Sequence, residues 1–139
     1  MKREIKFRGK RLDTGEWEFG NLIIAENGAP YIFPPEICEV DGHHLRQGDD
    51  KPHWVDPATV GQFTGLKDRN GREIYEGDIM EIPETEFNAR IIGTVEYQED
   101  SFFIQSRNGG SAWGLHWSLR KHDAGILGNL PDNPELLNK

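Results

Sequence analysis

Cysteine and long hydrophobic runs are the scarcest features of this chain of 139 residues. Its one thiol, Cys38, cannot form an intrachain disulfide, which fits a reducing compartment. Ile37 and Val40 lie close to Cys38, so a small buried residue is a simpler interpretation than a nucleophile. No apolar run approaches membrane-spanning length, and the start does not have the pattern of a signal peptide. We therefore expect a cytoplasmic protein with no membrane partner.

Positive charge is also scarce, because 16 Lys and Arg face 24 Asp and Glu and leave a net charge of −8. This charge argues against broad, unspecific binding to nucleic acid or to an anionic membrane. The basic residues are nevertheless concentrated near the start, where only Glu4 opposes them. They are Lys2, Arg3, Lys6, Arg8, Lys10 and Arg11. The solvated face of a strand explains them more simply than a phosphate-binding strip.

Apolar residues make up 35% of the chain, which is few for a globular protein but too many, and too well patterned, for a disordered one. Sixteen glycines and eight prolines suit a turn-rich β domain rather than a helical bundle. The length fits one domain, residues 1–139, with a core of its own.

Sequence motifs of catalysis are missing as well. The chain has no nucleotide-binding glycine loop, no nucleophile elbow and no Cys–His pairing. We therefore predict no cofactor, and an enzyme is the last of three functional hypotheses.

The stretch Asp56 to Ile82 is rich in turn residues and β-formers. Asp56-Pro57 has the pattern of a helix start, and the run from Val60 to Gly65 that of a strand with Phe63 as its core anchor. Asp68-Arg69-Asn70-Gly71 is the strongest turn signal in the chain. The stretch then predicts a strand at 72–75, a turn at Glu76-Gly77-Asp78 and a strand at 78–82 that Pro83 ends.

The rest of the chain predicts further strands separated by turns. Residues 41–53 are polar and aperiodic, and we expect them to form a loop excursion. A small helix capped by Asn133, with Pro134 at its first position, should close the chain. The strands are expected at 4–10, 16–25, 31–33, 90–97, 102–104, 113–119 and 126–129.

These elements predict a mainly β fold with an N-terminal hairpin and a short C-terminal helix. By analogy, the order of turns and strands around residues 77–104 is typical of an SH3-like element. We expect bent strands that close a barrel or half-barrel. Its interior should hold Ile74, Ile79, Val95, Phe103 and Ile126.

The run TVGQFTGLKDRNGREIYEGDI resembles the signature of the YopX-like family of phage and prophage proteins. The opening REIKFRGKRLDTGEWEFGNLI and the closing GILGNLPDNPELL resemble the same family. The resemblance covers most of the chain outside about residues 25–54 and 83–120, and it implies a phage origin, a bacterial host, a mostly β fold and no assigned catalytic residue. The signature residues, expected to be structural, are Gly61, Gln62, Phe63, Thr64, Gly65, Asp68, Gly71, Tyr75, Glu76, Gly77, Asp78, Gly128 and Asn129.

Two groups of polar residues are candidate sites. His43, His44 and His53, with Asp49 and Asp50, could bind a divalent metal, but they lack the spacing of ligands on one regular element, and a solvated loop explains them better. Five carboxylates between residues 68 and 81 could perform acid–base chemistry or hold Mg²⁺. Because Asp68 and Asp78 lie in turns, a structural role is the simpler interpretation for this second group.

Aromatic residues form the third candidate site. Together with Arg8 or Arg69, they could bind a peptide or stack on bases, although aromatic side chains are usual in β cores. The aromatic residues are Trp54, Tyr75, Trp113 and Trp117.

The first hypothesis is therefore a non-enzymatic module that binds a protein partner or copies of itself. A nucleic-acid-binding accessory factor that uses the basic N-terminal strand is second, and a carboxylate-dependent enzyme is third.

Overall fold

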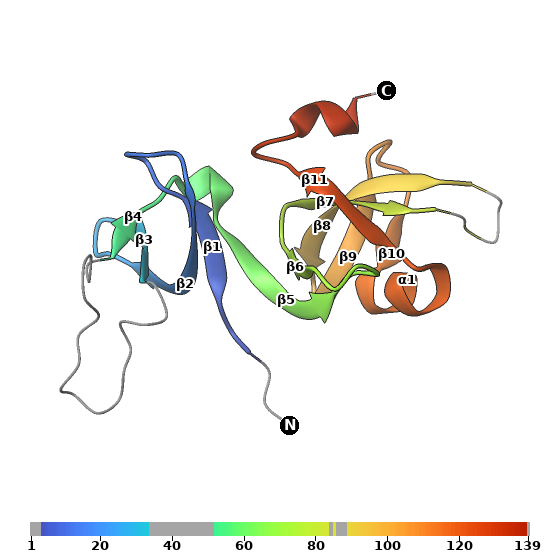
Figure 1. Cartoon of the computed structure of the whole chain (residues 1–139), viewed down its shortest axis with the longest axis horizontal. Helices are drawn as coiled ribbons and strands as arrows, with labels where there is room; N and C mark the ends of the chain where they lie inside the picture. The colour runs from blue at the N-terminus through green and yellow to red at the C-terminus, as the bar shows by residue number, and fades with distance from the viewer. Residues whose placement is uncertain (1–3, 34–51, 84, 86–88, 139) are drawn as a thin grey trace. The chain divides into compact units, whose positions relative to one another are not determined.

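The computed structural model describes residues 4–33, 52–83, 85 and 89–138, and the chain divides into two compact units, Met1–Phe63 and Thr64–Lys139. The strands are β1 (Phe7–Lys10), β2 (Trp17–Ile24), β3 (Pro30–Phe33), β4 (His53–Trp54), β5 (Gly61–Lys67), β6 (Glu73–Tyr75), β7 (Asp78–Ile82), β8 (Ile91–Gln98), β9 (Ser101–Ser106), β10 (Ala112–Gly114) and β11 (Gly125–Asn129). The helical elements are α1 (Leu115–His122) and the 3₁₀ helices Pro57–Thr59 and Pro134–Leu137 (Figure 1).

The N-terminal unit is built on an antiparallel meander in the order β4-β3-β2-β1-β5. The hairpin of β1 and β2 pairs Arg8 with Phe19 and Lys10 with Trp17. The segment after β4 also meets the end of β1, because Val55 forms a bridge with Arg11 and the N–H of Asp56 donates to the carbonyl of Lys10.

The core of this unit lies on the inner face of the meander. Ile32 and Val55 are fully buried there. Gly9 lies so close to the Val55 side chain that a Cβ at this position would collide with it. Burying each of these aliphatic side chains stabilises the fold by about 1.5–3 kcal/mol.

The C-terminal unit contains an antiparallel sheet in the order β10-β9-β8-β7-β11. Its core is a single cluster of buried side chains drawn from β6, β7, β8, β9, α1 and the residue before β11. The cluster comprises Ile74, Met80, Ile82, Val95, Ile104, Leu115 and Ala124. Strand β5 starts in the N-terminal unit, where Gln62 pairs with Phe7, and runs into the C-terminal unit, where the Thr64 hydroxyl donates to the carbonyl of Ile74.

The turns predicted between residues 56 and 82 all form. The Asp56 side chain accepts from the N–H of Ala58 and caps the 3₁₀ helix Pro57–Thr59. Gly71 and Gly77 adopt φ values of 81° and 90°, in the left-handed region that favours glycine. The helix predicted at the C-terminus forms as the 3₁₀ helix Pro134–Leu137. The predicted cap is wrong, because the Asn133 side chain makes no capping hydrogen bond to this helix and accepts from the N–H of Asn129 instead.

The mainly β prediction is confirmed, with two details corrected. The described strands form two open antiparallel sheets and no closed barrel. Phe103 is not inside, because it pairs with the exposed Glu96 on the outer face of β8 and β9. Its neighbours Phe102 and Ile104 point the other way and contact or form the core.

The prediction of a strand at residues 113–119 is wrong, since α1 starts at Leu115. Trp113, Leu115, Trp117 and Leu119 alternate in the sequence, but the buried positions of α1 are Leu115 and Ser118, with Leu119 packed on the core. That spacing is helical. The Ser118 hydroxyl donates to the carbonyl of Gly114, and basic residues in the last turn suit the negative end of the helix dipole.

Replacing Ile104 by Ala should lower the free energy of unfolding of the C-terminal unit by about 2–5 kcal/mol, because it leaves a cavity in the cluster. Chemical denaturation followed by circular dichroism measures the loss. Leu127→Ala, at an exposed position of the same sheet, is the matched control and should cost less than about 1 kcal/mol. Equal losses for the two variants would contradict this placement of the core.

Candidate binding surface

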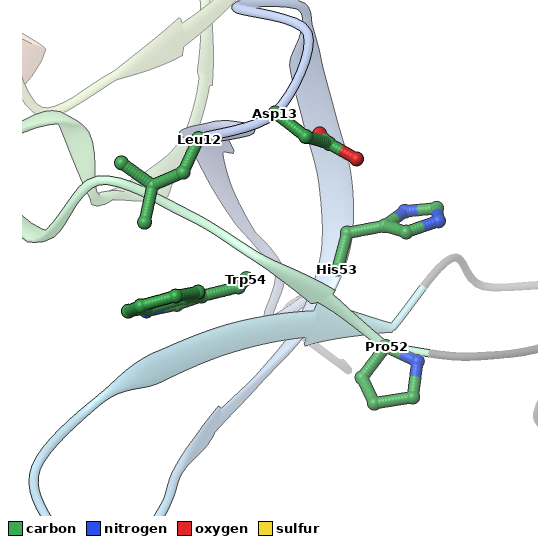
Figure 2. Close-up of a pocket in the computed structure, with 5 residues that line it drawn as sticks. All are labelled: Leu12, Asp13, Pro52, His53 and Trp54. Carbon is green, nitrogen blue, oxygen red and sulfur yellow. The ribbon is translucent and has the colours of Figure 1, made fainter.

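A pocket of about 400 Å³ opens on the surface of the N-terminal unit. Leu12, Asp13, Pro52, His53 and Trp54 line it. Figure 2 shows the Leu12 side chain and the Trp54 ring toward the left of the view and the Asp13 and His53 side chains toward the right. Trp54 is 54% exposed and Leu12 is 49% exposed, so two large apolar groups face solvent side by side.

Trp54 is exposed but firmly held. Its ring stacks on Tyr31, with 6.4 Å between centroids and 24° between planes. Its backbone pairs with Tyr31 in β3, and its carbonyl accepts from the N–H of Leu12 at 3.1 Å. A ring with so little freedom loses little conformational entropy when a partner covers it.

Charged groups border the pocket. The Nδ1 atom of His53 lies 2.8 Å from a Glu18 carboxylate oxygen, and the Arg11 guanidinium lies 3.5 Å from the same oxygen. Arg11 also donates two hydrogen bonds to Asp13, which hold the pKa of that carboxyl below its ordinary value. The pocket therefore combines an apolar floor with an anionic group at its edge.

Of the three histidines proposed as metal ligands, the structure describes one, His53. His53 lies in β4 and contacts Glu18, whereas His43 and His44 lie outside the described residues, as do Asp49, Asp50 and Cys38. In the part of the chain that the structure describes, no group of three or more His, Cys, Asp or Glu side chains could hold a metal ion.

The predicted aromatic and basic residues do not converge on one site. Tyr75 is 2% exposed and Arg8 is 7% exposed, so both offer little surface. Trp113 and Trp117 stack on each other in the C-terminal unit, 5.8 Å apart, and His122 packs edge-on against Trp117 at 4.7 Å. Trp54 is the most exposed tryptophan of the predicted set and the one that lines the pocket.

Sequence reasoning missed Leu12 and Pro52 as partners of Trp54. Leu12 did carry a signal, because it is an apolar residue at the entrance of a polar turn, Asp13-Thr14-Gly15. Its approach to Trp54 depends on pairing between segments about forty residues apart, which no local pattern indicates.

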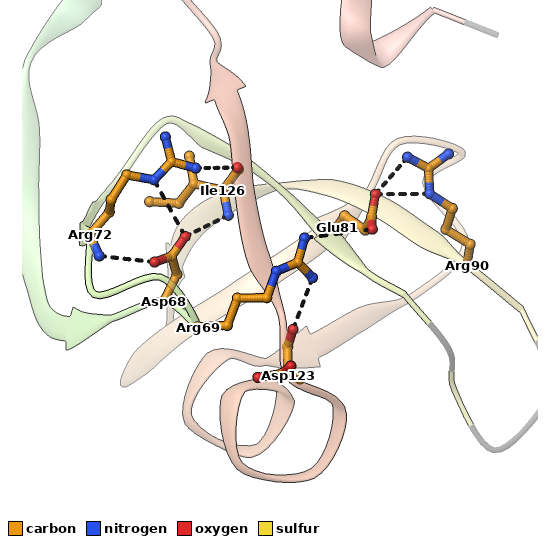
Figure 3. A network of polar contacts seen from close by, with 7 residues as sticks. All are labelled: Asp68, Arg69, Arg72, Glu81, Arg90, Asp123 and Ile126. Atoms are coloured by element: carbon orange, nitrogen blue, oxygen red, sulfur yellow. Dashed lines mark hydrogen bonds and ion pairs between the residues drawn. The ribbon is translucent and has the colours of Figure 1, made fainter.

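The carboxylate of Asp68 is a structural centre of the C-terminal unit. Its side chain is fully buried and accepts from the N–H groups of Asn70, Arg72 and Ile126, each at 2.9 Å. The Arg72 guanidinium lies 3.7 Å away and donates to the carbonyl of Ile126. Figure 3 shows this pair of side chains contacting both polar groups of one residue in β11.

Burial alone would raise the pKa of Asp68. The three N–H donors and the charge of Arg72 outweigh that effect and hold the pKa below its ordinary value of 3.8. Asp68 is therefore ionised at neutral pH and fully hydrogen-bonded, which makes it a poor general acid or base.

The neighbouring charged residues are also engaged within the unit. Glu81 accepts two hydrogen bonds from Arg90 and lies 3.9 Å from Arg69, which donates to the carbonyl of Asp123. Gly125 leaves the room in which the Arg69 guanidinium lies. Arg69, predicted as a binding residue, thus ties the turn at 68–71 to the start of β11.

The remaining signature residues have identifiable structural positions. Asp78 accepts from the N–H of Tyr75 at 2.8 Å and closes the turn at Glu76-Gly77. Gly128 leaves space for Asn133 and Leu136 beside β11, and a Cβ there would collide with the Asn133 side chain. Gly61, Gln62, Phe63 and Thr64 belong to β5, as does Gly65, which adopts a φ of 87°.

The signature residues fall in both units, from Gly61 in the first to Asn129 in the second. The family model described as YopX protein matches residues 6–138. The chain belongs to the YopX family. The resemblance found in the sequence is thereby confirmed, and the match also spans the segments at 25–54 and 83–120.

Among solved structures, the chain is similar to protein EF1440 from Enterococcus faecalis. The two share 20% sequence identity and align with a TM-score of 0.55, over 99% of this chain and 100% of the other. At this identity the likeness shows the fold alone. A comparison with curated proteins gave no match. No helix among the described residues is long and apolar enough to cross a membrane.

Replacing Asp68 by Asn should destabilise the protein by about 2–3 kcal/mol at neutral pH, because the variant loses charge-assisted hydrogen bonds at a buried position. Thermal unfolding measures the loss. Asp100→Asn, in the exposed turn after β8, is the matched control and should leave stability nearly unchanged. If both variants were as stable as the parent, the hydrogen bonds of the buried Asp68 carboxylate would not support the fold.

The stability of the parent and that of Asp68→Asn should depend differently on pH. The folded state lowers the pKa of Asp68, so the stability that its charge supplies is complete above the unfolded pKa and is lost as pH falls through the lower folded pKa. The stability difference between the parent and Asp68→Asn should be constant near neutral pH and shrink below about pH 4. A difference that grows on acidification would contradict this sign.

Proposed function

We propose that this protein is a non-enzymatic binding module that acts through protein contacts, with the pocket of Leu12 and Trp54 as its contact point. The observation that carries the proposal is a tryptophan 54% exposed to solvent yet fixed by stacking and by strand pairing. Rigid, partly exposed aromatic side chains beside a pocket are the usual anchors of protein interfaces.

The dimensions of the pocket suit side chains from a partner. A volume of about 400 Å³ is at the lower end of ligand sites and accommodates one or two apolar side chains. The ion pair of Arg11 and Asp13 at the edge offers polar groups beside the apolar anchor. Self-association is one form of this function, in which a second copy supplies the anchor.

The enzyme hypothesis has less support. Asp68, Asp78 and Glu81 belong to the group of carboxylates between residues 68 and 81, and each is engaged by backbone N–H groups or guanidinium groups. A catalytic carboxylate needs access to a substrate and a pKa suited to proton transfer. Asp68 has neither property, because its side chain is buried and its pKa is held below the ordinary value.

The setting of the function follows from the family. We propose a phage or prophage protein that works in the cytoplasm of a bacterial host, needs no cofactor and acts as one functional domain across its two compact units. Residues 77–104 would serve in this module as an SH3-like element. Membership of the YopX family supports the phage setting.

The test is affinity capture from a bacterial host lysate with the immobilised full-length protein, followed by mass spectrometry. The amount of each specifically captured protein should fall at least about tenfold when Trp54→Ala is used instead of the parent. The reason is that truncating an interface anchor commonly costs about 2 kcal/mol or more of binding free energy. Light scattering on the same proteins measures self-association and its dependence on Trp54.

Trp117→Ala is the matched control, because it removes a tryptophan that is 38% exposed in the C-terminal unit. Both variants should melt near the parent protein if the loss of binding is a surface effect. A strictly monomeric parent that captures nothing, or capture that Trp54→Ala leaves unchanged, would overturn the proposal.

A further inference from the structure

One face of the β1–β2 hairpin carries cations and aromatic rings in alternation. We define the β1–β2 strip as Lys6, Arg8, Lys10, Trp17 and Phe19. We propose that this strip binds single-stranded nucleic acid, with bases stacked on its rings and phosphates paired with its lysines. The site is separate from the pocket of Leu12 and Trp54, and the proposal goes beyond the protein-binding function.

The register of the hairpin places the strip on one face. Lys10 lies opposite Trp17 and Arg8 lies opposite Phe19, and directly opposed residues of an antiparallel pair share a face. The alternate residues point to the other side, where Gly9 packs against Val55. The strip therefore lies on the face of the strand pair opposite to the one that packs against Val55.

Contacts within the strip hold the rings in place. The Arg8 guanidinium lies 4.6 Å from the centroid of the Trp17 ring, and the Lys10 ammonium lies 5.6 Å from it. Lys6 lies 5.0 Å from the Phe63 ring in β5. Arg8 is nearly buried and acts as a positioning residue, whereas Phe19 is 42% exposed and Trp17 and Lys10 are half-buried.

The charge of the strip contrasts with that of the whole chain. None of the β1 and β2 residues on this face is acidic, and both strands are fully described. Glu18, the acidic residue within β2, points to the opposite face and contacts His53. Glu4 lies beyond the end of β1 and pairs with Lys6 at 3.3 Å. With Glu4 counted against these three cations, a local excess of two positive charges remains in a protein of net charge −8.

Single strands suit this arrangement better than duplexes. Stacking requires bases that are free of pairing, and grooves that bind single strands combine aromatic platforms with basic residues along the backbone. Cations at every second position of a strand recur at about 6.6–6.8 Å, so successive cations can meet an extended backbone. The net negative charge of the chain opposes the looser, purely electrostatic binding of duplex DNA.

The test is fluorescence anisotropy with the full-length protein and a labelled oligothymidylate of about twelve nucleotides, at low and at physiological salt. Binding should weaken with salt at a logarithmic slope near −1.4, because the two phosphates that Lys6 and Lys10 neutralise each contribute about 0.7. Lys10→Gln should reduce the slope by about 0.7, whereas Lys121→Gln, on α1, should leave it unchanged.

Substitutions of Phe19 separate stacking from simple apolar contact. Phe19→Leu should weaken binding by about fivefold or more, and Phe19→Tyr should retain it, because only the second variant keeps a ring. Tyr97→Ala, an exposed ring in β8, is the control and should bind like the parent. Trp54→Ala should also bind like the parent, so that failure of this proposal and of the pocket proposal can be told apart.

Three results would overturn the inference. The first is no binding of the oligonucleotide at low salt, which would leave the strip as a cation–π ladder that only stabilises the hairpin. The second is equal affinity for Phe19→Leu and the parent. The third is equal binding of polyglutamate, which would indicate a general anion surface or a site for an acidic peptide.

Discussion

The C-terminal unit depends on one buried charge, the carboxylate of Asp68. A buried anion is costly unless hydrogen-bond donors surround it, and here three backbone N–H groups and the Arg72 guanidinium do so. Two of the donors close the turn at residues 68–71, and the third belongs to β11. Because one carboxylate satisfies both segments, the position of the last strand is coupled to the conformation of a tight turn 58 residues earlier in the chain.

Asp68 and Arg72 together also cover the outer edge of β11. Strand β11 pairs with β7 on one side, and on the other side Asp68 accepts from the N–H of Ile126 while Arg72 donates to its carbonyl. The two side chains replace the partners that another strand would offer, which removes a template for edge-to-edge association. This gives the acidic and basic residues of the signature a structural role. The two binding surfaces that we propose, the pocket of Trp54 and the β1–β2 strip, lie in the N-terminal unit.

Local patterns predicted most of the strands because their signals act over a few residues. Asn70-Gly71 and Glu76-Gly77 form turns with left-handed glycines, and Asp78–Ile82 is a strand with the predicted bounds. The prediction failed where the apolar residues of a short segment fitted both the two-residue period of a strand and the 3.6-residue period of a helix. Trp113 to Leu119 alternates like a strand, yet Leu115, Ser118 and Leu119 also have helical spacing, and packing on the core decides for α1. Phe103 was misassigned for a related reason, since Phe102-Phe103-Ile104 is apolar throughout and only the register with β8 decides which residues point inward.

The sequence by itself determined the mainly β class, the turns, the family and the local excess of cations near the start, because each depends on neighbouring residues or on the order of a motif. Tertiary structure alone decided which charged groups are used internally and which surfaces stay open. Asp68 meets Ile126, Glu18 meets His53 and Leu12 meets Trp54 only after strands far apart in the chain have paired. Pairing register also places Lys10 opposite Trp17 and Arg8 opposite Phe19 on one face of the hairpin. The physical reason is that side chains alternate along a strand, so the face on which a residue lies becomes fixed only when its partners are in place.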